Sequence, residues 1–266
     1  MNCTKALLAL CAITQTTAFV VQSPKASTTQ LSSSSVDELF TRNVWDTASP
    51  ILVQGDSLRT FVTHTDRVQV LLKTEGRPLS SEIELWYGPD YTPTTVKIYL
   101  EDGNLSPFNA VLETPYSNTV AVYNRGQMEF PLFASVKPEV QGGLKFVKER
   151  LYDTSPSDLI QGGALRTYQF DASTRSVQVL LKTDGRHLVA RIEILQGPNN
   201  NKQVIEFYSS DGKKRSFFAV FETPEAGCVV RIVNEKSIEY PFTACVEPYT
   251  VDADYSASEP VIGGDP

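Results

Sequence analysis

Histidine is the side chain that most often acts as a general acid or base near neutral pH, and this chain of 266 residues has only two, His64 and His187. The sequence contains no HExxH, GxSxG, Walker A or Cys-x-x-Cys pattern, and no GxGxxG after a predicted strand. Such patterns mark metal, nucleophile, phosphate and dinucleotide sites. We therefore expect no catalytic residue, no metal site and no cofactor. Carboxylate-only hydrolases carry no compact motif, so a hydrolase that uses Glu84 or Asp102 stays open as one hypothesis beside the two given at the end of this subsection.

Charged residues recur in pairs along the chain. Six of them have a counterpart of the same sign 107 to 109 positions further on. A duplicated ligand site would produce this pattern, but duplicated turns and solvated strand faces would produce it too, and we favour that second interpretation. The pairs are Arg59 and Arg166, Lys73 and Lys182, Arg77 and Arg186, Glu84 and Glu193, Asp102 and Asp211, and Glu113 and Glu222.

The same twelve-residue block occurs twice, which explains these pairs. VQVLLKTEGRPL begins at Val68 and VQVLLKTDGRHL begins at Val177, 109 positions later. Further matches flank the blocks, among them WDT with YDT, two Gly-Pro pairs and two Glu-Thr-Pro triplets. Solenoid repeats have periods of roughly 20 to 50 residues, so a period near 109 indicates a duplicated small domain instead.

The first 34 residues have the composition of a targeting leader. Lys5 precedes an apolar run over 6–13, and the stretch that follows is rich in Ser and Thr and has no acidic residue. This order is typical of a signal peptide followed by a transit peptide, and the Thr-Ala-Phe at 17–19 is similar to the junction of two-part plastid leaders in diatoms. Ordinary secretion stays open as the alternative. The apolar run is shorter than the roughly 20 residues that span a bilayer, so we expect no transmembrane segment in the mature chain.

Composition and charge limit the remaining possibilities. A hydrophobic content of 41% is enough for two modest cores, and a formal net charge of -7 disfavours binding to nucleic acid. The expected organisation is a bipartite plastid-targeting leader over 1–34, a first β repeat unit over 35–138 with a short N-terminal helix, a linker over 139–150, a second β repeat unit over 151–248, and an acidic C-terminal tail over 249–266.

Apolar and polar residues alternate in both units, which predicts antiparallel strands. Gly76 and Gly185 lie within the repeated blocks at predicted hairpin turns, where glycine can take positive φ. About six or seven strands per unit predict an all-β protein with two homologous antiparallel β domains in tandem, sandwich-like or with strongly curved sheets, related by a pseudo-two-fold axis. Only 35–43 and 143–152 have helical character, and the second could equally be a strand.

Several apolar residues fall on the opposite face of the strands from the predicted core. If Ile83 and Ile98 point inward, this outward set forms our candidate assembly interface, because contiguous exposed apolar residues usually mark contacts between molecules. The alternative is that both faces are covered inside one molecule. The set comprises Leu71, Trp86, Tyr99 and Val111 in the first unit and Leu180, Leu195, Tyr208 and Val220 in the second.

Two cysteines lie outside the predicted leader, Cys228 and Cys245, and their first-unit counterparts are Asn118 and Ser135. A disulfide that defined the fold would be expected in both units, so we favour two buried thiols. A bond between the two cysteines stays open.

The leader, the duplicated VQVLLKT-(E/D)-GR block and the Gly-Pro and Glu-Thr-Pro landmarks together resemble the diatom pyrenoid shell proteins, called PyShell, over about residues 44–248. The resemblance implies a structural protein, not an enzyme, that assembles with itself into a sheet or tube around the pyrenoid, the Rubisco condensate of the plastid stroma. It implies a location at the pyrenoid periphery and support for CO2 concentration and fixation. The Rubisco matrix and other shell paralogues are further candidate partners. The family has no catalytic residues to carry over.

The alternative from a different class is a binding module. Tandem β domains could recognise carbohydrate or lipid through the outward Trp86 and Tyr99, with Arg59 and Arg166 as polar partners.

Overall fold

The computed structural model describes residues 45, 48–88, 90–115, 118–138, 151, 153, 155–197, 200–224 and 227–252. Within these residues the fold is made of strands, and only Trp45, Leu151 and Asp153 have helical backbone. The all-β prediction is confirmed. The predicted leader, the helix over 35–43 and the segment 143–150 lie outside the described residues.

Each repeat contributes eight strands, against the six or seven expected. Those of the first repeat are β1 (Ile51–Val53), β2 (Ser57–Thr63), β3 (Arg67–Lys73), β4 (Leu79–Trp86), β5 (Thr94–Leu100), β6 (Phe108–Glu113), β7 (Asn118–Asn124) and β8 (Leu132–Pro138). Those of the second are β9 (Asp158–Ile160), β10 (Leu165–Phe170), β11 (Thr174–Lys182), β12 (Leu188–Leu195), β13 (Asn201–Ser209), β14 (Phe217–Glu222), β15 (Cys228–Asn234) and β16 (Phe242–Val251).

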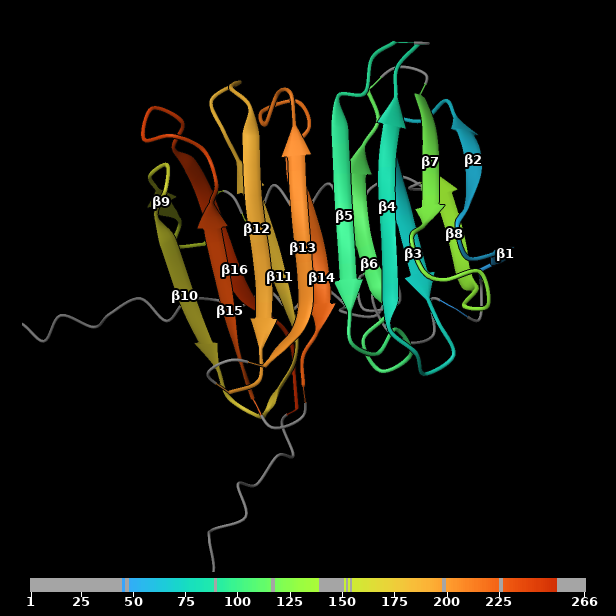
Figure 1. The fold of residues 1–266 in the computed structure, drawn as a ribbon. Coiled ribbons are helices and arrows are strands. Elements are labelled where there is room, and N and C mark those ends of the chain that lie inside the picture. Colours follow the sequence, from blue (N-terminus) through green and yellow to red (C-terminus); the bar gives the residue numbers. More distant parts are fainter. Residues whose placement is uncertain are drawn as a thin grey trace, which may run out of the picture. The chain divides into compact units, whose positions relative to one another are not determined.

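The strands form two antiparallel sheets of eight, and both sheets run through both repeats (Figure 1). Sheet A has the order β1-β8-β3-β6-β14-β11-β16-β9, and sheet B has the order β10-β15-β12-β13-β5-β4-β7-β2. Each sheet therefore takes four strands from each repeat, and corresponding strands occupy mirrored places in the order. The repeats join through β6 with β14 in sheet A and through β5 with β13 in sheet B.

The strand registers locate a pseudo-two-fold axis at this junction. In sheet B, Lys97 lies opposite Glu206, and in sheet A, Ala110 lies opposite Ala219. The two residues of each pair are 109 positions apart, so each residue faces its own counterpart in the other repeat. Only a two-fold relation pairs a position with its own counterpart in both sheets, so the registers agree with the predicted symmetry.

One hydrophobic core fills the space between the sheets and crosses the junction without interruption. It includes Val70 and Ile83 of the first repeat together with Ile205, Phe217 and Ile232 of the second, all less than 1% exposed. The repeats thus share one core as well as two sheets. The second repeat also extends beyond the predicted boundary at 248, because β16 continues to Val251.

The two sheets differ in what covers their outer faces. Strand β4 of sheet B alternates strictly between buried and part-exposed residues, as expected for a sheet with one solvated face. Strand β3 of sheet A is buried at every position from Val68 to Leu72. Sheet A is therefore covered on both sides at β3, whereas sheet B has an open outer face at β4.

Duplicated turns close the two ends of the sandwich in the same way. The buried Nδ2 of Asn124 donates to the carbonyl oxygens of Val53 and Phe130, and Asn234 repeats this with Ile160 and Tyr240. The backbone of Gly55 passes so close to the β7–β8 loop that a Cβ on residue 55 would lie 1.7 Å from the carbonyl oxygen of Gln127. Gly162 has the same relation to the carbonyl oxygen of Ser237. Glycine is therefore required at both Gln-Gly motifs, because only a residue without a Cβ permits this close approach of two backbone segments.

Candidate functional site

The eight outward residues predicted from strand alternation do lie on the opposite face from the main core, but most of them are covered. Tyr99 is 45% exposed, and Trp86 and Tyr208 are half-buried. The other five, which are no more than 4% exposed, are Leu71, Val111, Leu180, Leu195 and Val220. Those five side chains are too buried to contact another molecule in this conformation. Of the predicted set, only the three aromatic residues are accessible for such a contact.

The cover on sheet A accounts for three of the buried residues. Val111, Leu180 and Val220 form a second apolar cluster with Phe218 and Cys245, and Leu151, only 3% exposed, belongs to it. Leu151 precedes β9, the first strand of the second repeat. On sheet A, these three side chains are therefore covered within the molecule.

The open face of sheet B carries a network of ion pairs. Arg125 binds Glu82 at 2.6 Å, and Arg191 binds Glu193 at 2.8 Å. Glu193 also accepts from Arg231. Its side chain is only 5% exposed, so the two guanidinium groups compensate a buried charge.

This network crosses the pseudo-two-fold axis. Lys97 lies 3.9 Å from Glu206, and Arg191 lies 3.8 Å from the same carboxylate. A strictly symmetric pair at the axis would set like charges against each other. The chain has opposite charges there instead, which favours this pairing of unlike repeats over pairing of like repeats.

The aromatic residues of the open face are tied to polar neighbours. The indole N–H of Trp86 donates to Glu84 at 2.7 Å. The ring of Tyr208 stacks on His187 at 6.1 Å between centroids, and its hydroxyl lies 3.3 Å from the imidazole Nδ1. Tyr99 borders a shallow hollow of about 190 Å³ with Lys97. The contacts of His187 support a structural role for this histidine.

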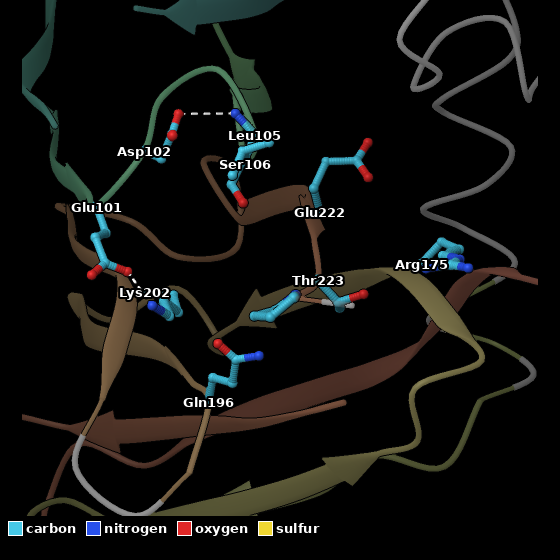
Figure 2. Close-up of a pocket in the computed structure, with 10 residues that line it drawn as sticks. Glu101, Asp102, Leu105, Ser106, Arg175, Gln196, Lys202, Glu222 and Thr223 are labelled. Atoms are coloured by element: carbon cyan, nitrogen blue, oxygen red, sulfur yellow. Dashed lines mark hydrogen bonds and ion pairs between the residues drawn. The ribbon is translucent and has the colours of Figure 1, made fainter. Parts of the chain in front are cut away.

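A larger pocket of about 610 Å³ lies where the β5–β6 turn meets the ends of strands from the second repeat (Figure 2). Figure 2 shows Lys202 paired with Glu101, and Asp102 accepting from the backbone N–H of Leu105 at 3.1 Å. Arg175, also in the lining, binds Asp252 at 3.0 Å. The described lining contains no histidine or cysteine.

Contacts of the mirrored charges fit the interpretation that they belong to duplicated structure. Asp102 and Asp211 each accept two backbone N–H groups of their own turn. Arg67 binds Glu113 at 2.9 Å, and Lys73 lies over the ring of Trp45 at 4.6 Å.

Both cysteines are free and buried, so the disulfide alternative is not realised. Burial raises the pKa of the Cys228 thiol to about 11. Burial, followed by the charges of Glu247 and Asp158, also raises the pKa of Cys245. Because the thiolate is the reactive form, neither side chain is suited to act as a nucleophile at neutral pH.

Exposed apolar residues gather instead at the two ends of the sheets, which strand alternation did not single out. Leu52 and Leu58 are 40% and 37% exposed at the first-repeat end, and their counterparts Leu159 and Leu165 are each 55% exposed at the other end. The sequence does show these leucines at the same places beside both Gln-Gly motifs. Their exposure could not be predicted from this recurrence, because a single leucine does not indicate whether its strand lies at the edge of a sheet.

Within the described ranges, no group of histidine, cysteine and acidic residues could hold a metal ion. No helix among those residues is long and apolar enough to cross a membrane.

The comparisons with solved structures are weak. The formate complex of Lactobacillus farciminis oxalate decarboxylase is 6% identical and aligns over 76% of this chain and 77% of its own, with a TM-score of 0.20. Recombinant pro-11S globulin of pumpkin is 7% identical over 73% of this chain and 77% of its own, with a TM-score of 0.15. Procruciferin, the 11S globulin of Brassica napus, is 8% identical over 72% and 77%, with a TM-score of 0.16. Scores this low support no conclusion about this chain.

No curated protein matches the chain. The family model described as "diatom pyrenoid shell protein", in contrast, matches residues 45–248. The match begins at Trp45 and ends within β16, so it includes both repeats and most of the described strands. The chain therefore belongs to the diatom pyrenoid shell protein family, a family of structural proteins of the plastid pyrenoid and not of enzymes.

Proposed function

We propose that this chain assembles with itself into a sheath around the pyrenoid, the Rubisco condensate, and so supports CO2 concentration and fixation. The observation that carries the proposal is the family match across both repeats. Its structural support is the shared core, because a rigid unit with two related halves offers the same contacts twice and can extend a lattice.

The proposed place of action is the plastid stroma at the pyrenoid periphery. The leader composition supports import into a plastid. On the open face of sheet B, Trp86, Tyr99 and Tyr208 are our proposed contact residues, because they are the members of the predicted set that retain exposed surface. The Rubisco matrix and related shell proteins are proposed as further neighbours.

Electron microscopy of the purified full chain, concentrated at neutral pH without partners, tests the assembly. We expect regular sheets or tubes. Dispersed particles at every concentration would contradict self-assembly and favour the binding-module alternative, which saturable binding in glycan and liposome screens would then have to support.

A fluorescent fusion expressed in a diatom tests the location. A thin fluorescent boundary around the Rubisco signal is the expected image. Fluorescence throughout the Rubisco condensate, or outside the plastid, would contradict a peripheral sheath.

A further inference from the structure

We propose that the two ends of the sandwich are the surfaces through which one copy of this chain binds the next, so that copies join into a row. The first-repeat end is formed by the edge strands β1 and β2, and the second-repeat end by β9 and β10. This inference rests on the proposed self-assembly and names the surface and the partner, a second copy of the chain.

The edge strands at both ends keep one side available for pairing. Sheet A ends at β1 and β9 and sheet B ends at β2 and β10, and no strand of the described residues pairs with their outer sides. Figure 1 shows β9 and β10 at one end of the strand order and β1 and β2 at the other. Within the described part of the chain, each end therefore presents two strand edges to which no further strand is paired, one from each sheet.

The sheet B edges at β2 and β10 lack the usual protection against pairing, whereas the sheet A edge strands β1 and β9 have only three residues each. Monomeric β proteins protect an edge with very short strands, lysine, proline, bulges or inward charges. Strand β2 reads SLRTFVT and β10 reads LRTYQF, so each has a single arginine and neither has lysine or proline. Both are pairing surfaces by this criterion.

The apolar residues of the described surface are concentrated at these ends. Of the thirteen large hydrophobic side chains that are exposed among the described residues, eight lie on the edge strands or on the loops beside them. Six of the eight form three counterpart pairs, so the two ends resemble each other. The pairs are Leu52 and Leu159, Leu58 and Leu165, and Met128 and Ile238, and the remaining two residues are Ile51 and Val62.

The internal junction shows what kind of partner fits such an end. There, two related repeats already join edge to edge, with β5 pairing β13 and β6 pairing β14, and both sheets continue across the joint. A repeat of this fold thus uses a pair of strand edges to bind another copy of the same fold. The outer ends offer the same kind of edge pair with added apolar side chains, so a second copy of the chain is the occupant that matches them in sheet number and strand direction.

Both arrangements of such a joint extend a row. If the first-repeat end binds the second-repeat end of the next copy, the contact is heterologous and repeats without limit. If like ends bind, each joint is two-fold, and the other end of each copy remains available for the next joint. A row forms either way because the two ends lie on opposite sides of the pseudo-two-fold axis.

Charge substitutions at the ends of the full chain test this inference. One variant carries Leu58→Lys and Val62→Lys at the first-repeat end, a second carries Leu165→Lys at the other, and a third combines all three. The matched control is Leu105→Lys, because Leu105 is 63% exposed but lies in the β5–β6 turn away from both ends. Circular dichroism and thermal unfolding establish that every variant keeps the native β fold, as expected for exposed positions.

Sedimentation and electron microscopy then give the assembled fraction against concentration. We expect the wild-type chain and the control to assemble alike, and the triple variant to need at least about tenfold more protein or to remain monomeric. Each single-end variant alone should stop at monomers or dimers. An equimolar mixture of the two single-end variants distinguishes the arrangements, because dimers that form only on mixing indicate a heterologous joint.

The outcomes separate this inference from the proposed function. If wild type, control and triple variant all assemble alike, the ends are not the contact surface, although self-assembly stands. If the control fails together with the triple variant, added charge alone is responsible and the inference is overturned. If the wild-type chain itself stays dispersed, self-assembly fails and the row fails with it.

Discussion

Single residues explain why particular motifs occur in both repeats. The Gln-Gly pairs, the Glu-Thr-Pro triplets and the two asparagines all belong to turns with the same hydrogen bonds. Thr114 Oγ1 donates to the carbonyl oxygen of Thr65, and Thr223 Oγ1 donates to that of Thr174. These repeated motifs therefore hold the duplicated loops in place.

The tightest backbone contacts at the residue scale are those of Gly55 and Gly162, and the second gives a prediction. Replacing Gly162 with alanine would place a Cβ 1.7 Å from a carbonyl oxygen, so the loop must move or the variant must unfold. We expect Gly162→Ala to lower the free energy of unfolding by roughly 3 kcal/mol, measured by chemical denaturation. Gly76→Ala is the control, because Gly76 has φ of 67° but nothing within 4 Å of its Cβ position. It should cost only about 1 kcal/mol, and equal losses in the two variants would contradict the close approach.

Titration of Cys228 predicts a pH dependence of stability. Burial raises the pKa of its thiol from the ordinary value of 9.0 to about 11. As pH rises through this range, the unfolded chain loses the proton first, so the free energy of unfolding falls by at most about 1.4 kcal/mol per pH unit from this group. Other groups titrate in the same range, so the measurement is the difference between wild type and Cys228→Ala in denaturation at pH 8 and pH 10.5. The alanine variant should lose less stability on going to high pH, and parallel losses would contradict the assignment.

At the element scale, most strands could be predicted and their partners could not. Alternation is a local property, so it located β4 and β5 and placed Trp86 and Tyr99 outward. The three-residue strands β1 and β9 are too short to alternate recognisably. The pairing of β5 with β13 joins segments about 109 residues apart, and no local pattern encodes it. Nor could alternation distinguish the open face of sheet B from the covered face of sheet A. Whether a face is covered depends on residues outside the strands, such as Leu151, and the strand pattern does not locate them.

That cover gives a prediction for Leu151. Leu151 is 3% exposed and packs in the apolar cluster on sheet A. Leu151→Ala should lower the free energy of unfolding by about 2 to 4 kcal/mol, since it leaves a cavity beside Val220 and Phe218. Leu105→Ala is the matched control, because Leu105 is 63% exposed and the same truncation there should change stability by less than about 0.5 kcal/mol. Denaturant unfolding of both variants decides, and similar values would show that Leu151 does not cover the sheet.

At the scale of the whole molecule, the shared sheets imply that neither repeat is complete alone. Separating the repeats would expose the edges of β5, β6, β13 and β14 and divide one continuous core. We expect residues 45–138 and 151–252, when produced together as separate chains, to form a one-to-one complex with the native β circular dichroism spectrum. Each half alone should aggregate or pair weakly with itself, because unpaired strand edges tend to form hydrogen bonds with strands of other chains.

The residues at the pseudo-two-fold axis predict which pairs form. Two copies of the first half would set Lys97 against Lys97, and two copies of the second would set Glu206 against Glu206, whereas the mixed pair joins opposite charges at 3.9 Å. The two side chains are 60% and 42% exposed, so the preference from this contact alone is at most about 1 kcal/mol and should weaken in high salt. Lys97→Glu in the first half should therefore reduce its affinity for the second half by a few fold at low salt, measured by titration of one labelled half with the other. The effect should disappear near 1 M salt, where the Debye length is about 3 Å. A loss of affinity that persists at that salt concentration would mean that Lys97 contributes packing and not charge selection at the junction.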